Sequence, residues 1–447
     1  MTPLPRADRA RAGAEARRRV TPASHAGWRP APDRPDPVAL LEEQAGTRVP
    51  QLVPIRYGRM LVSPFTFFRG AALPMAADLA ATPVSGLDAQ LVGDAHLSNF
   101  GLFASPERNL LFDMNDFDET LPGPWEWDLK RLTASLIVAA RDRGFDHHQA
   151  RHAVRAATLS YARHMTEYAS MRALDVYYSR VDAAAIEEYV TTRARPYLER
   201  TVKAAAHHDT VHELPKLTTV VDGRRRIVDL PPTIWHPEWA DPDIPDEAIA
   251  AYRLSLQEDR RALLDRYVLE DVAVKVVGVG SVGLGALAAL FGGGDPDDPL
   301  LLQVKEAEAS VLERFLARST YANHGERVVA GQRRLQAASD VFLGWSKGKG
   351  GRHIYIRQLQ DQKASAVVDA MDHDDLVSWG ELCAWALARG HARSGDPAAI
   401  AGYVGDGEDL GDALADFAAA YADQNERDHA ALAAAATSGR VAVETGV

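Results

Sequence analysis

The chain has one cysteine among its 447 residues, so it cannot form a disulfide within itself. Such a chain is typical of a reducing compartment, and we expect a cytoplasmic protein in which Cys383 is a buried core residue. Long apolar runs are also missing. The nearest candidate for a membrane span, residues 276–291, has 16 residues and several glycines, whereas a span needs about 20 apolar residues. We therefore expect no membrane span.

Basic residues are in the minority, with 50 Lys and Arg against 62 Asp and Glu and a net charge of −12. This balance disfavours nucleic acid or an anionic membrane surface as a partner, because both attract basic proteins. The apolar fraction of 46% and the charged fraction of 25% are typical of a soluble globular protein. The length suffices for two or three lobes, and the oligomeric state is left open.

Two neighbouring motifs carry the strongest chemical signal in the chain. Residues 93–99 read Gly-Asp-Ala-His-Leu-Ser-Asn, and residues 112–119 read Phe-Asp-Met-Asn-Asp-Phe-Asp-Glu. Phosphoryl transfer requires a carboxylate that orients the attacking hydroxyl, and it requires oxygen ligands for magnesium. We expect Asp94 to be the catalytic base, and Asn99 and Asp116 to be the Mg²⁺ ligands.

Some assignments within these motifs have alternatives. Asp113 and Asp118 compete with Asp116 as the second metal ligand. His96 is expected to brace the first loop through a hydrogen bond, with direct proton transfer as the alternative. Because carboxylates crowded into one place repel one another, a cation is expected beside them.

Residues 93–129 resemble the core of the aminoglycoside and choline phosphotransferases. The pattern of those enzymes is His-Gly-Asp-x-His-x-x-Asn, then Ile-Asp-Phe, then an aromatic residue with Asp-Leu. Residues 127–129, Trp-Asp-Leu, match the last part, and Asp116 lies 12 residues before Asp128 as in that pattern. The resemblance implies that Asp128 supports the loop. Val92 departs from the pattern, because it stands where those enzymes have His.

Several longer phrases extend the resemblance over most of residues 50–405. They are Ser63-Pro64-Phe65, Phe68-Arg69-Gly70, Gly93-Asp94-Ala95-His96, Asn115-Asp116-Phe117-Asp118-Glu119 and Gln303-Val304-Lys305-Glu306-Ala307. With them the chain resembles the uncharacterised bacterial domain-of-unknown-function family 2252. That family is grouped with kinase-like folds, so the resemblance implies a protein-kinase-like fold without indicating a substrate.

A glycine-rich segment, Gly278-x-Gly280-x-x-Gly283-x-Gly285, follows a valine-rich run. It is compatible with a kinase glycine loop over ATP phosphates, with a dinucleotide-binding turn, or with a purely structural hairpin. A dinucleotide fold places an acidic residue at the end of the next strand, whereas here the next strand, Leu-Gln-Val-Lys, ends in Lys305. This ending resembles the kinase Val-Ala-Ile-Lys and favours the ATP loop.

Lys305 is expected to contact the α and β phosphates of ATP and to be held by a glutamate. Glu313, which follows the strand, is preferred over Glu326 for this role, although either could be only a solvated helix charge. Arg69 either contacts a phosphate or forms an ordinary buried salt bridge.

The order of these parts along the chain is unusual. In ordinary kinases the glycine loop and the lysine precede the catalytic loop, but here they follow it by roughly 180 residues. The helix predicted over 374–393 resembles the helix that comes just before the catalytic loop in aminoglycoside-type kinases. We therefore predict a circularly permuted fold in which Lys305 lies close to Asp94 and Asp116.

The predicted fold is α+β and protein-kinase-like, with a large helical lobe and a small antiparallel β lobe for the nucleotide. Residues 127–143 are predicted as a helix, 56–70 as a strand or loop, and 341–359 as a hairpin. The predicted segments are a mobile Arg/Pro-rich tail (1–49), the catalytic loop and helical lobe (50–270), the glycine loop and nucleotide lobe (271–362), and C-terminal helices that pack on the helical lobe (363–447).

These features predict an ATP- and Mg²⁺-dependent phosphotransferase that acts on a hydroxyl acceptor, either a small molecule or a protein. Transfer of AMP instead of phosphate and a nucleotide-binding pseudokinase with a regulatory role are the alternatives. A Rossmann-type NAD enzyme is less favoured. The sequence does not identify the acceptor.

Overall fold

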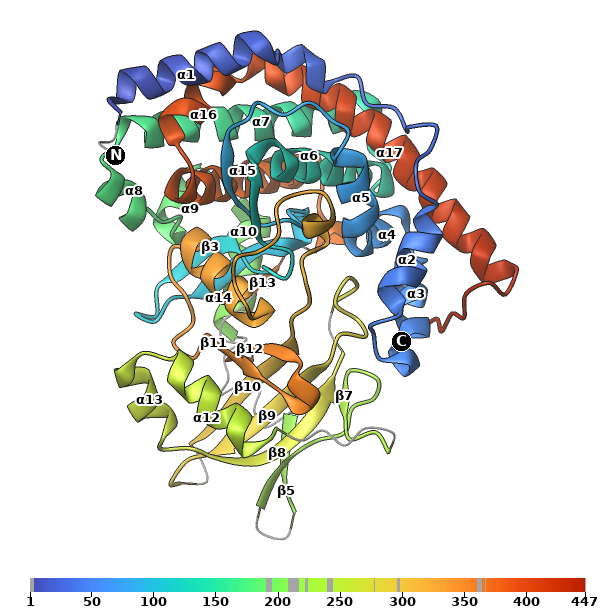
Figure 1. The fold of residues 1–447 in the computed structure, drawn as a ribbon, viewed down its shortest axis with the longest axis vertical. Coiled ribbons are helices and arrows are strands. Elements are labelled where there is room, and N and C mark those ends of the chain that lie inside the picture. The colour runs from blue at the N-terminus through green and yellow to red at the C-terminus, as the bar shows by residue number, and fades with distance from the viewer. Residues whose placement is uncertain are drawn as a thin grey trace.

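The computed structural model describes residues 4–189, 195–207, 217–221, 224–238, 244–276, 278–295, 298–359, 364–365 and 367–446. Helices gather at one end of the molecule, and a six-stranded antiparallel sheet forms the other end (Figure 1). We call these ends the helical part and the sheet part. The predicted α+β class with an antiparallel sheet is confirmed.

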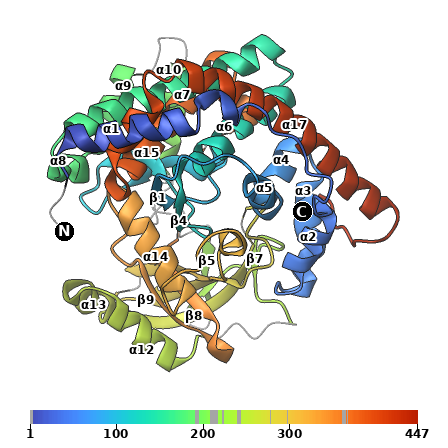
Figure 2. The same ribbon diagram turned by 45° about the horizontal axis from the view of Figure 1, so that its top comes forward.

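The helical part is built around α6 (Trp125–Asp142), which is buried along nearly its whole length. A helix with burial on all sides is expected at the centre of a bundle. The long helices α7 (His147–Ser170), α15 (His373–Ser394) and α17 (Glu408–Thr437) pack around it (Figure 2). The shorter helices of this part are α4 (Pro64–Gly70), α5 (Ala72–Leu79), α8 (Ala173–Tyr178), α9 (Ala183–Tyr189), α10 (Arg195–His207) and α16 (Pro397–Val404).

The N-terminal residues form α1 (Arg6–Arg19), which lies along α16 (Figure 1). The two helices approach closely, since a Cβ placed on Gly13 would lie 1.9 Å from the carbonyl oxygen of Ala399. The predicted mobile tail over residues 1–49 is therefore wrong. The buried residues of this helix are Gly13 and Ala16, while Arg9 pairs with Asp396 and Arg17 donates to the Tyr403 carbonyl oxygen, so some of its arginines fasten the helix to the protein.

The six strands of the sheet part follow the order β11-β12-β10-β9-β8-β7, and every neighbouring pair is antiparallel. The helices α12 (Asp246–Ser255) and α13 (Glu258–Leu264) share an apolar core with these strands. They belong to the sheet part, although the sequence places them in the helical lobe of residues 50–270. The strands are β7 (Ile234–Trp235), β8 (Val268–Lys275), β9 (Ala286–Gly292), β10 (Pro299–Glu306), β11 (Gly344–Lys347) and β12 (His353–Gln358).

Short strands and helices join the two parts. β1 pairs with β4, and β13, β2 and β3 form a three-stranded sheet. The first motif is therefore the loop between β1 and β2, and the second runs from the end of β3 into the loop before β4. Both motifs are thereby held at the ends of paired strands. These elements are β1 (Asp88–Leu91), β2 (Phe100–Ala104), β3 (Leu110–Met114), β4 (Leu121–Pro124), β13 (Ala364–Ser365), the hairpin of β5 (Thr218–Val221) and β6 (Arg224–Ile227), α2 (Pro37–Ala45), α3 (Val53–Met60) and α14 (His324–Leu335).

Local predictions hold for the strongly patterned segments and fail for one aromatic segment. The helix predicted over 127–143 is α6, and the hairpin over 341–359 is β11 and β12. Residues 56–70, however, form the helices α3 and α4 instead of a strand or loop. Proline lies in the first turn of each helix, and Ser63 begins α4 with a capping box, which are local signals for helix starts.

Cys383 is buried in α15, as predicted for a core residue. Across the described ranges, none of the helices has the length and apolar character that crossing a membrane requires.

Candidate functional site

The first motif forms a tight loop after β1. Asp128, in the first turn of α6, accepts hydrogen bonds from Val92 N at 2.7 Å and from Gly93 N at 2.9 Å, which is the supporting role expected for it. Gly93 has φ of +84°, and a Cβ at this position would lie 2.3 Å from the carbonyl oxygen of Glu119. Only glycine fits there, and the first motif is consequently packed directly against the second.

Asp94 lies within this loop beside Arg131 of α6. Arg131 Nε donates to Asp94 Oδ1 at 2.8 Å, and His96 Nε2 lies 3.8 Å from Asp94 Oδ2. Burial raises the pKa of Asp94, while Arg131 opposes that rise. Burial also lowers the pKa of His96 well below its usual range, and His96 Nδ1 accepts a hydrogen bond from Ser98 N at 3.2 Å. This geometry fits a neutral His96 that braces the loop.

Asn99 connects the two motifs. Its carbonyl oxygen accepts a hydrogen bond from Asn115 N at 3.0 Å, and its Nδ2 donates to the carbonyl oxygen of Asp94 at 2.8 Å. With Nδ2 used in this way, Oδ1 is the side-chain atom left to act as a ligand. Asp94, Asn99 and Asp116 line one cavity, so the three residues predicted for base and metal binding are brought together.

The carboxylates of the second motif divide into two groups. Asp113 is fully buried and lies 2.6 Å from Nη2 of Arg389 in α15, so it is a structural ion-pair partner and is set aside as a metal ligand. Asp116 and Asp118 lie in the loop after β3. Lys305 Nζ donates a hydrogen bond to Asp118 and lies 3.8 Å from Asp116 Oδ2, which confirms the predicted proximity of Lys305 to Asp116.

The local environment raises the pKa of Asp116 and lowers the pKa of Asp118. Burial raises the pKa of Asp116, and repulsion from Asp118 adds to that rise. Burial also acts to raise the pKa of Asp118, but Lys305 holds it below its usual value. Lys305 itself is buried, which disfavours its charge, yet the two carboxylates raise its pKa. The cluster therefore contains a firmly charged lysine, one ionised carboxylate and one carboxylate that takes up a proton more readily.

The glycine-rich segment connects β8 to β9, and these two strands pair in an antiparallel hairpin. A dinucleotide-binding turn leads from a strand into a helix, so this alternative is wrong for the segment. Gly283 has φ of +88°, a conformation that glycine adopts without strain. Ser281, within the segment, contacts Lys305 through an Oγ–Nζ hydrogen bond of 2.8 Å.

The four glycines that were predicted to bind the nucleotide lie in two different places. Gly278 and Gly280 line the cavity that contains Asp94 and Asp116. Gly283 and Gly285 lie farther along the segment, where a Cβ would meet the side chains of Arg48 and Glu306, respectively.

Glu313 has a different role from the one predicted. Its Oε1 accepts a hydrogen bond from Ser310 N at 3.3 Å and lies 3.8 Å from Arg327 Nε. The segment that contains it is turned toward Glu119, whose Oε2 accepts from Val311 N at 2.7 Å. Lys305 is instead paired with Asp118. Glu326 opens α14 in a turn that Asn323 caps.

Tyr355 and Arg327 are among the site residues that were not predicted from the sequence, as are Arg131 and Ser281. Tyr355 lies opposite Lys305 in the pairing of β12 with β10, and its hydroxyl donates to Asp118 Oδ1 at 2.8 Å. Arg327 in α14 is buried and donates to the carbonyl oxygens of Asp118 and Thr120, each at 2.7 Å. The predicted hairpin places Tyr355 near the end of a strand that could pair with the lysine strand, which is a weak signal. Nothing in the local sequence marks Arg327.

The cavity at this site is small, about 80 Å³, which is room for roughly three waters. It is enclosed by the two motifs, by the glycine-rich segment and by residues from the N-terminal helices. Its dimensions are those of a small ion or a phosphate group, so a whole nucleotide requires the glycine-rich segment to move outward.

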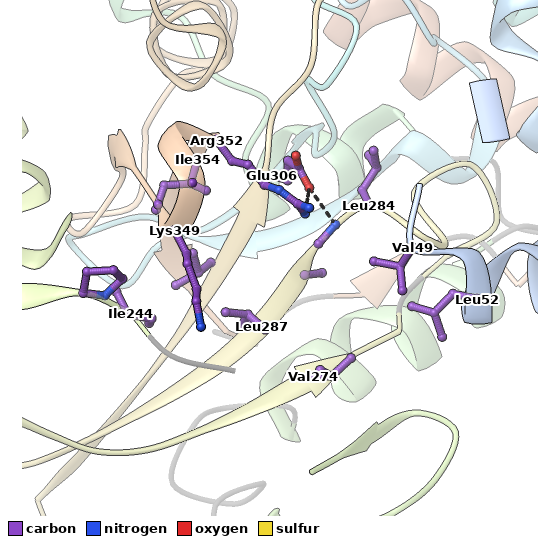
Figure 3. Close-up of a pocket in the computed structure, with 16 residues that line it drawn as sticks. Val49, Leu52, Ile244, Val274, Leu284, Leu287, Glu306, Lys349, Arg352 and Ile354 are labelled. Carbon is purple, nitrogen blue, oxygen red and sulfur yellow. Dashed lines mark hydrogen bonds and ion pairs between the residues drawn. The ribbon is translucent and has the colours of Figure 1, made fainter. Parts of the chain in front are cut away.

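A second cavity, of about 440 Å³, lies beside the glycine-rich segment (Figure 3). Val304 lines it, whereas the neighbouring Lys305 does not, because successive side chains of a strand point to opposite faces of the sheet. Its lining is mainly apolar, and Glu306 Oε2 lies 3.2 Å from Arg352 Nη1 and 3.3 Å from Gly285 N. This cavity is therefore separate from the Lys305 cluster.

These features define an α+β protein with an enclosed cluster of carboxylates, one lysine and one asparagine between two structural parts. Residues 48–435 match the family described as "Uncharacterized protein conserved in bacteria (DUF2252)", and the chain belongs to that family. No curated protein and no solved structure matches the chain.

Proposed function

We propose that the protein is an ATP- and Mg²⁺-dependent phosphotransferase with a kinase-like, circularly permuted fold. The observation that carries this proposal is the meeting of Lys305 with Asp116 and Asp118, and of Asn99 with Asp94. The three aspartates and Asn99 line one cavity, and Lys305 lies directly behind its wall. These groups come from three separate segments, and each has a chemical counterpart in phosphoryl transfer.

The arrangement of the sheet part supports the kinase-like fold. A glycine-rich hairpin (β8 and β9) is followed by the strand that ends near Lys305 (β10), then by α14 and the hairpin of β11 and β12. A glycine hairpin, a lysine on the third strand and a helix after it is the order of a kinase nucleotide lobe. Asp118 occupies the place beside the lysine where a helix glutamate is usual.

The position of α15 supports the permutation. A kinase of ordinary order runs from this helix straight into the catalytic loop, whereas here α15 lies about 300 residues later in the chain. Its end nevertheless adjoins β1: Ser394 Oγ accepts a hydrogen bond from Gln90 N at 3.1 Å, and a Cβ on Gly395 would lie 2.9 Å from the Asp88 carbonyl oxygen. His391 is also in α15, and its Nε2 lies 3.3 Å from Oδ2 of Asp128.

In the proposed reaction Asp94 orients the acceptor hydroxyl and accepts its proton, and Arg131 holds the carboxylate in place. Lys305 contacts the nucleotide phosphates, which take the place of Asp118 as its partners. The backbone of the glycine-rich segment covers the phosphates after Ser281 moves away from Lys305.

The donor set suits Mg²⁺. Asn99 Oδ1 and the carboxylate of Asp116 are hard oxygen donors on the wall of one cavity, with Asp118 as the alternative carboxylate. Mg²⁺ is usually held by one or two carboxylates together with phosphate oxygens and water. Among the residues that the structure describes, no cluster of three His, Cys, Asp or Glu side chains is suited to hold a metal. When bound, the ion neutralises phosphate charge.

Thermal unfolding with ATP or NAD, each with and without Mg²⁺, tests the proposal. A ligand that binds only the native state raises stability, by about 2.7 kcal/mol at 100 times its Kd. We expect a rise with ATP and Mg²⁺ together, no rise with NAD, and loss of the rise in Asp116→Ala. A rise with NAD alone, or the same rise in Asp116→Ala, contradicts the proposal.

Isotope labelling then separates the two transfer reactions. ATP labelled on the γ-phosphate transfers its label in phosphoryl transfer, whereas ATP labelled on the α-phosphate does so in AMP transfer. We expect transfer from the γ position only, and Asp94→Asn is expected to reduce it by about 10²–10⁴-fold, the range for general base catalysis. Binding of ATP without transfer of either label, across an acceptor screen, favours the regulatory pseudokinase.

A further inference from the structure

Three arginines from the N-terminal helices line the same cavity as Asp94 and Asp116. Arg48 follows α2, Arg56 lies in α3, and Arg69 lies near the end of α4. None of the three belongs to either acidic motif or to the glycine-rich segment, and the proposed phosphoryl transfer leaves them without a role.

Arg48 and Arg56 are buried, Arg69 is half-buried, and each has at least one unused donor. Arg56 is 1% exposed, and its Nε and Nη1 have no hydrogen-bond partner within the described ranges. Its Nη2 donates to the Gly70 carbonyl oxygen at 3.0 Å. Arg48 is 8% exposed and donates through Nη1 to the Val282 carbonyl oxygen, while its Nε is unpartnered. The Nε of Arg69 is also unpartnered.

The positive charge at this end of the cavity is balanced only in part, because the carboxylates that act on it are not in direct ion pairs with the three arginines. Burying an unpaired charge costs several kcal/mol, and burial lowers the pKa of all three arginines. Asp94 is bonded to Arg131, and Asp118 is bonded to Lys305. Glu119 accepts a hydrogen bond from Val311 N, and it acts on Arg48, together with Glu308, only from beyond ion-pair distance. Within the described part of the chain, no carboxylate lies at ion-pair distance from these arginines.

We propose that Arg48, Arg56 and Arg69 form a binding site for a phosphate group of the acceptor, so that the substrate is a small hydroxyl compound that already carries a phosphate. Guanidinium groups present planar pairs of donors that match phosphate oxygens, and a dianion balances three cations better than a carboxylate does. The cavity of about 80 Å³ has the size of such a group. Assignment to the acceptor rests on the proposed function, whereas the anion site does not.

The location of Arg69 indicates how the acceptor lies in the cavity relative to Asp94. Arg69 lines the same cavity as Asp94 and His96, and its charge acts on both, so a phosphate bound there lies beside the proposed base. In the reaction the acceptor oxygen forms a bond to the γ-phosphorus of ATP, and the bond from that phosphorus to the bridging oxygen breaks. ADP leaves with the electron pair, and the hydroxyl proton passes to Asp94.

Calorimetric titration with inorganic phosphate, in the absence of nucleotide, tests the site. We expect wild type to bind phosphate, and Arg69→Gln to bind it about tenfold more weakly or worse. Lys305→Met should weaken binding less than Arg69→Gln does, because it acts only through Asp118 in the cavity wall. The thermal midpoint of each variant without ligand shows whether it is folded. If Arg69→Gln is unfolded, Arg56→Lys keeps the charge but removes the forked donors, and we expect the same tenfold weakening.

The same variants are titrated with ATP and Mg²⁺, so that the two proposals fail in different ways. We expect Arg69→Gln to keep the nucleotide affinity of wild type. No phosphate binding at millimolar concentration overturns the anion site, and equal weakening by Lys305→Met and Arg69→Gln places phosphate in the nucleotide site instead. Phosphate binding in a wild-type protein that does not bind ATP overturns the proposed function and the assignment to an acceptor, while the anion site stands.

Discussion

Asp113 and Asp118 belong to one acidic run, yet they serve different regions of the molecule. Asp113, in β3, pairs with Arg389 of α15 in the helical part, and both side chains are fully buried. Asp118 pairs with Lys305 across the junction between the helical and sheet parts, and its side chain reaches a cavity. The first pair is closed to ligands and the second is not. Residue type and neighbouring sequence do not distinguish a structural ion pair from a binding one, but access to a cavity does.

The largest expected effect is a loss of stability, and it tests whether the pair of Asp113 and Arg389 is structural. Asp113→Ala leaves the Arg389 guanidinium buried without its partner, and such a loss costs about 3–5 kcal/mol. Chemical denaturation should show this drop in the free energy of unfolding. Asp175→Ala removes an exposed carboxylate paired with Arg172 and should have little effect. Similar losses in the two variants contradict the structural role of Asp113.

The next effect concerns nucleotide binding at the junction between the helical and sheet parts, where Lys305 lies. Lys305→Met should lose most of the stabilisation that ATP with Mg²⁺ provides, which is about 2.7 kcal/mol at 100 times Kd, because phosphates lose their cation. Thermal midpoints with and without the nucleotide measure this. Asp113→Ala, once corrected for its own lower stability, should keep the nucleotide-dependent rise. Retention of the full rise in Lys305→Met would remove Lys305 from the nucleotide site.

A third prediction concerns the closed packing of the helical part. Gly13→Leu places a side chain where α1 contacts the backbone of α16, and overpacking of this kind costs about 1–3 kcal/mol. Glu15→Leu, on the exposed side of the same helix, is the matched control and should change the free energy of unfolding much less. If both variants are as stable as wild type, α1 does not pack on α16 as described.

The last effect is on the pH dependence of stability. Burial raises the pKa of Glu119 from 4.5 to about 7, so the folded state binds more protons than the unfolded state between these values. Glu119 therefore contributes stability that is full below pH 4.5 and is lost as pH rises through 7. Glu119→Gln should flatten the decline between pH 4.5 and 7 in denaturation curves. Glu107→Gln, at an exposed position, should leave the decline as in wild type.

How far the site can be read from the sequence depends on the distances along the chain. Asp94 and Asn99 are five residues apart in one loop, so their proximity follows from local backbone geometry. The meeting of Lys305 with Asp116 was predicted only because of the resemblance to kinases. The partner of Lys305 was missed, because the turn after β10 carries Glu313 toward Ser310 and Arg327, a direction that no local pattern indicates.

The sequence by itself determined the α+β class, the long helices and the two motif loops, because hydrophobic periodicity, prolines and short-range spacing act locally. The tertiary structure alone decided three other features. It separated Asp113 from Asp118, docked the arginine-rich N-terminal helix on α16, and brought Arg48, Arg56 and Arg69 into the cavity of Asp94. Each of these depends on burial and on contacts between distant segments, whose free energy is set by packing of the whole chain.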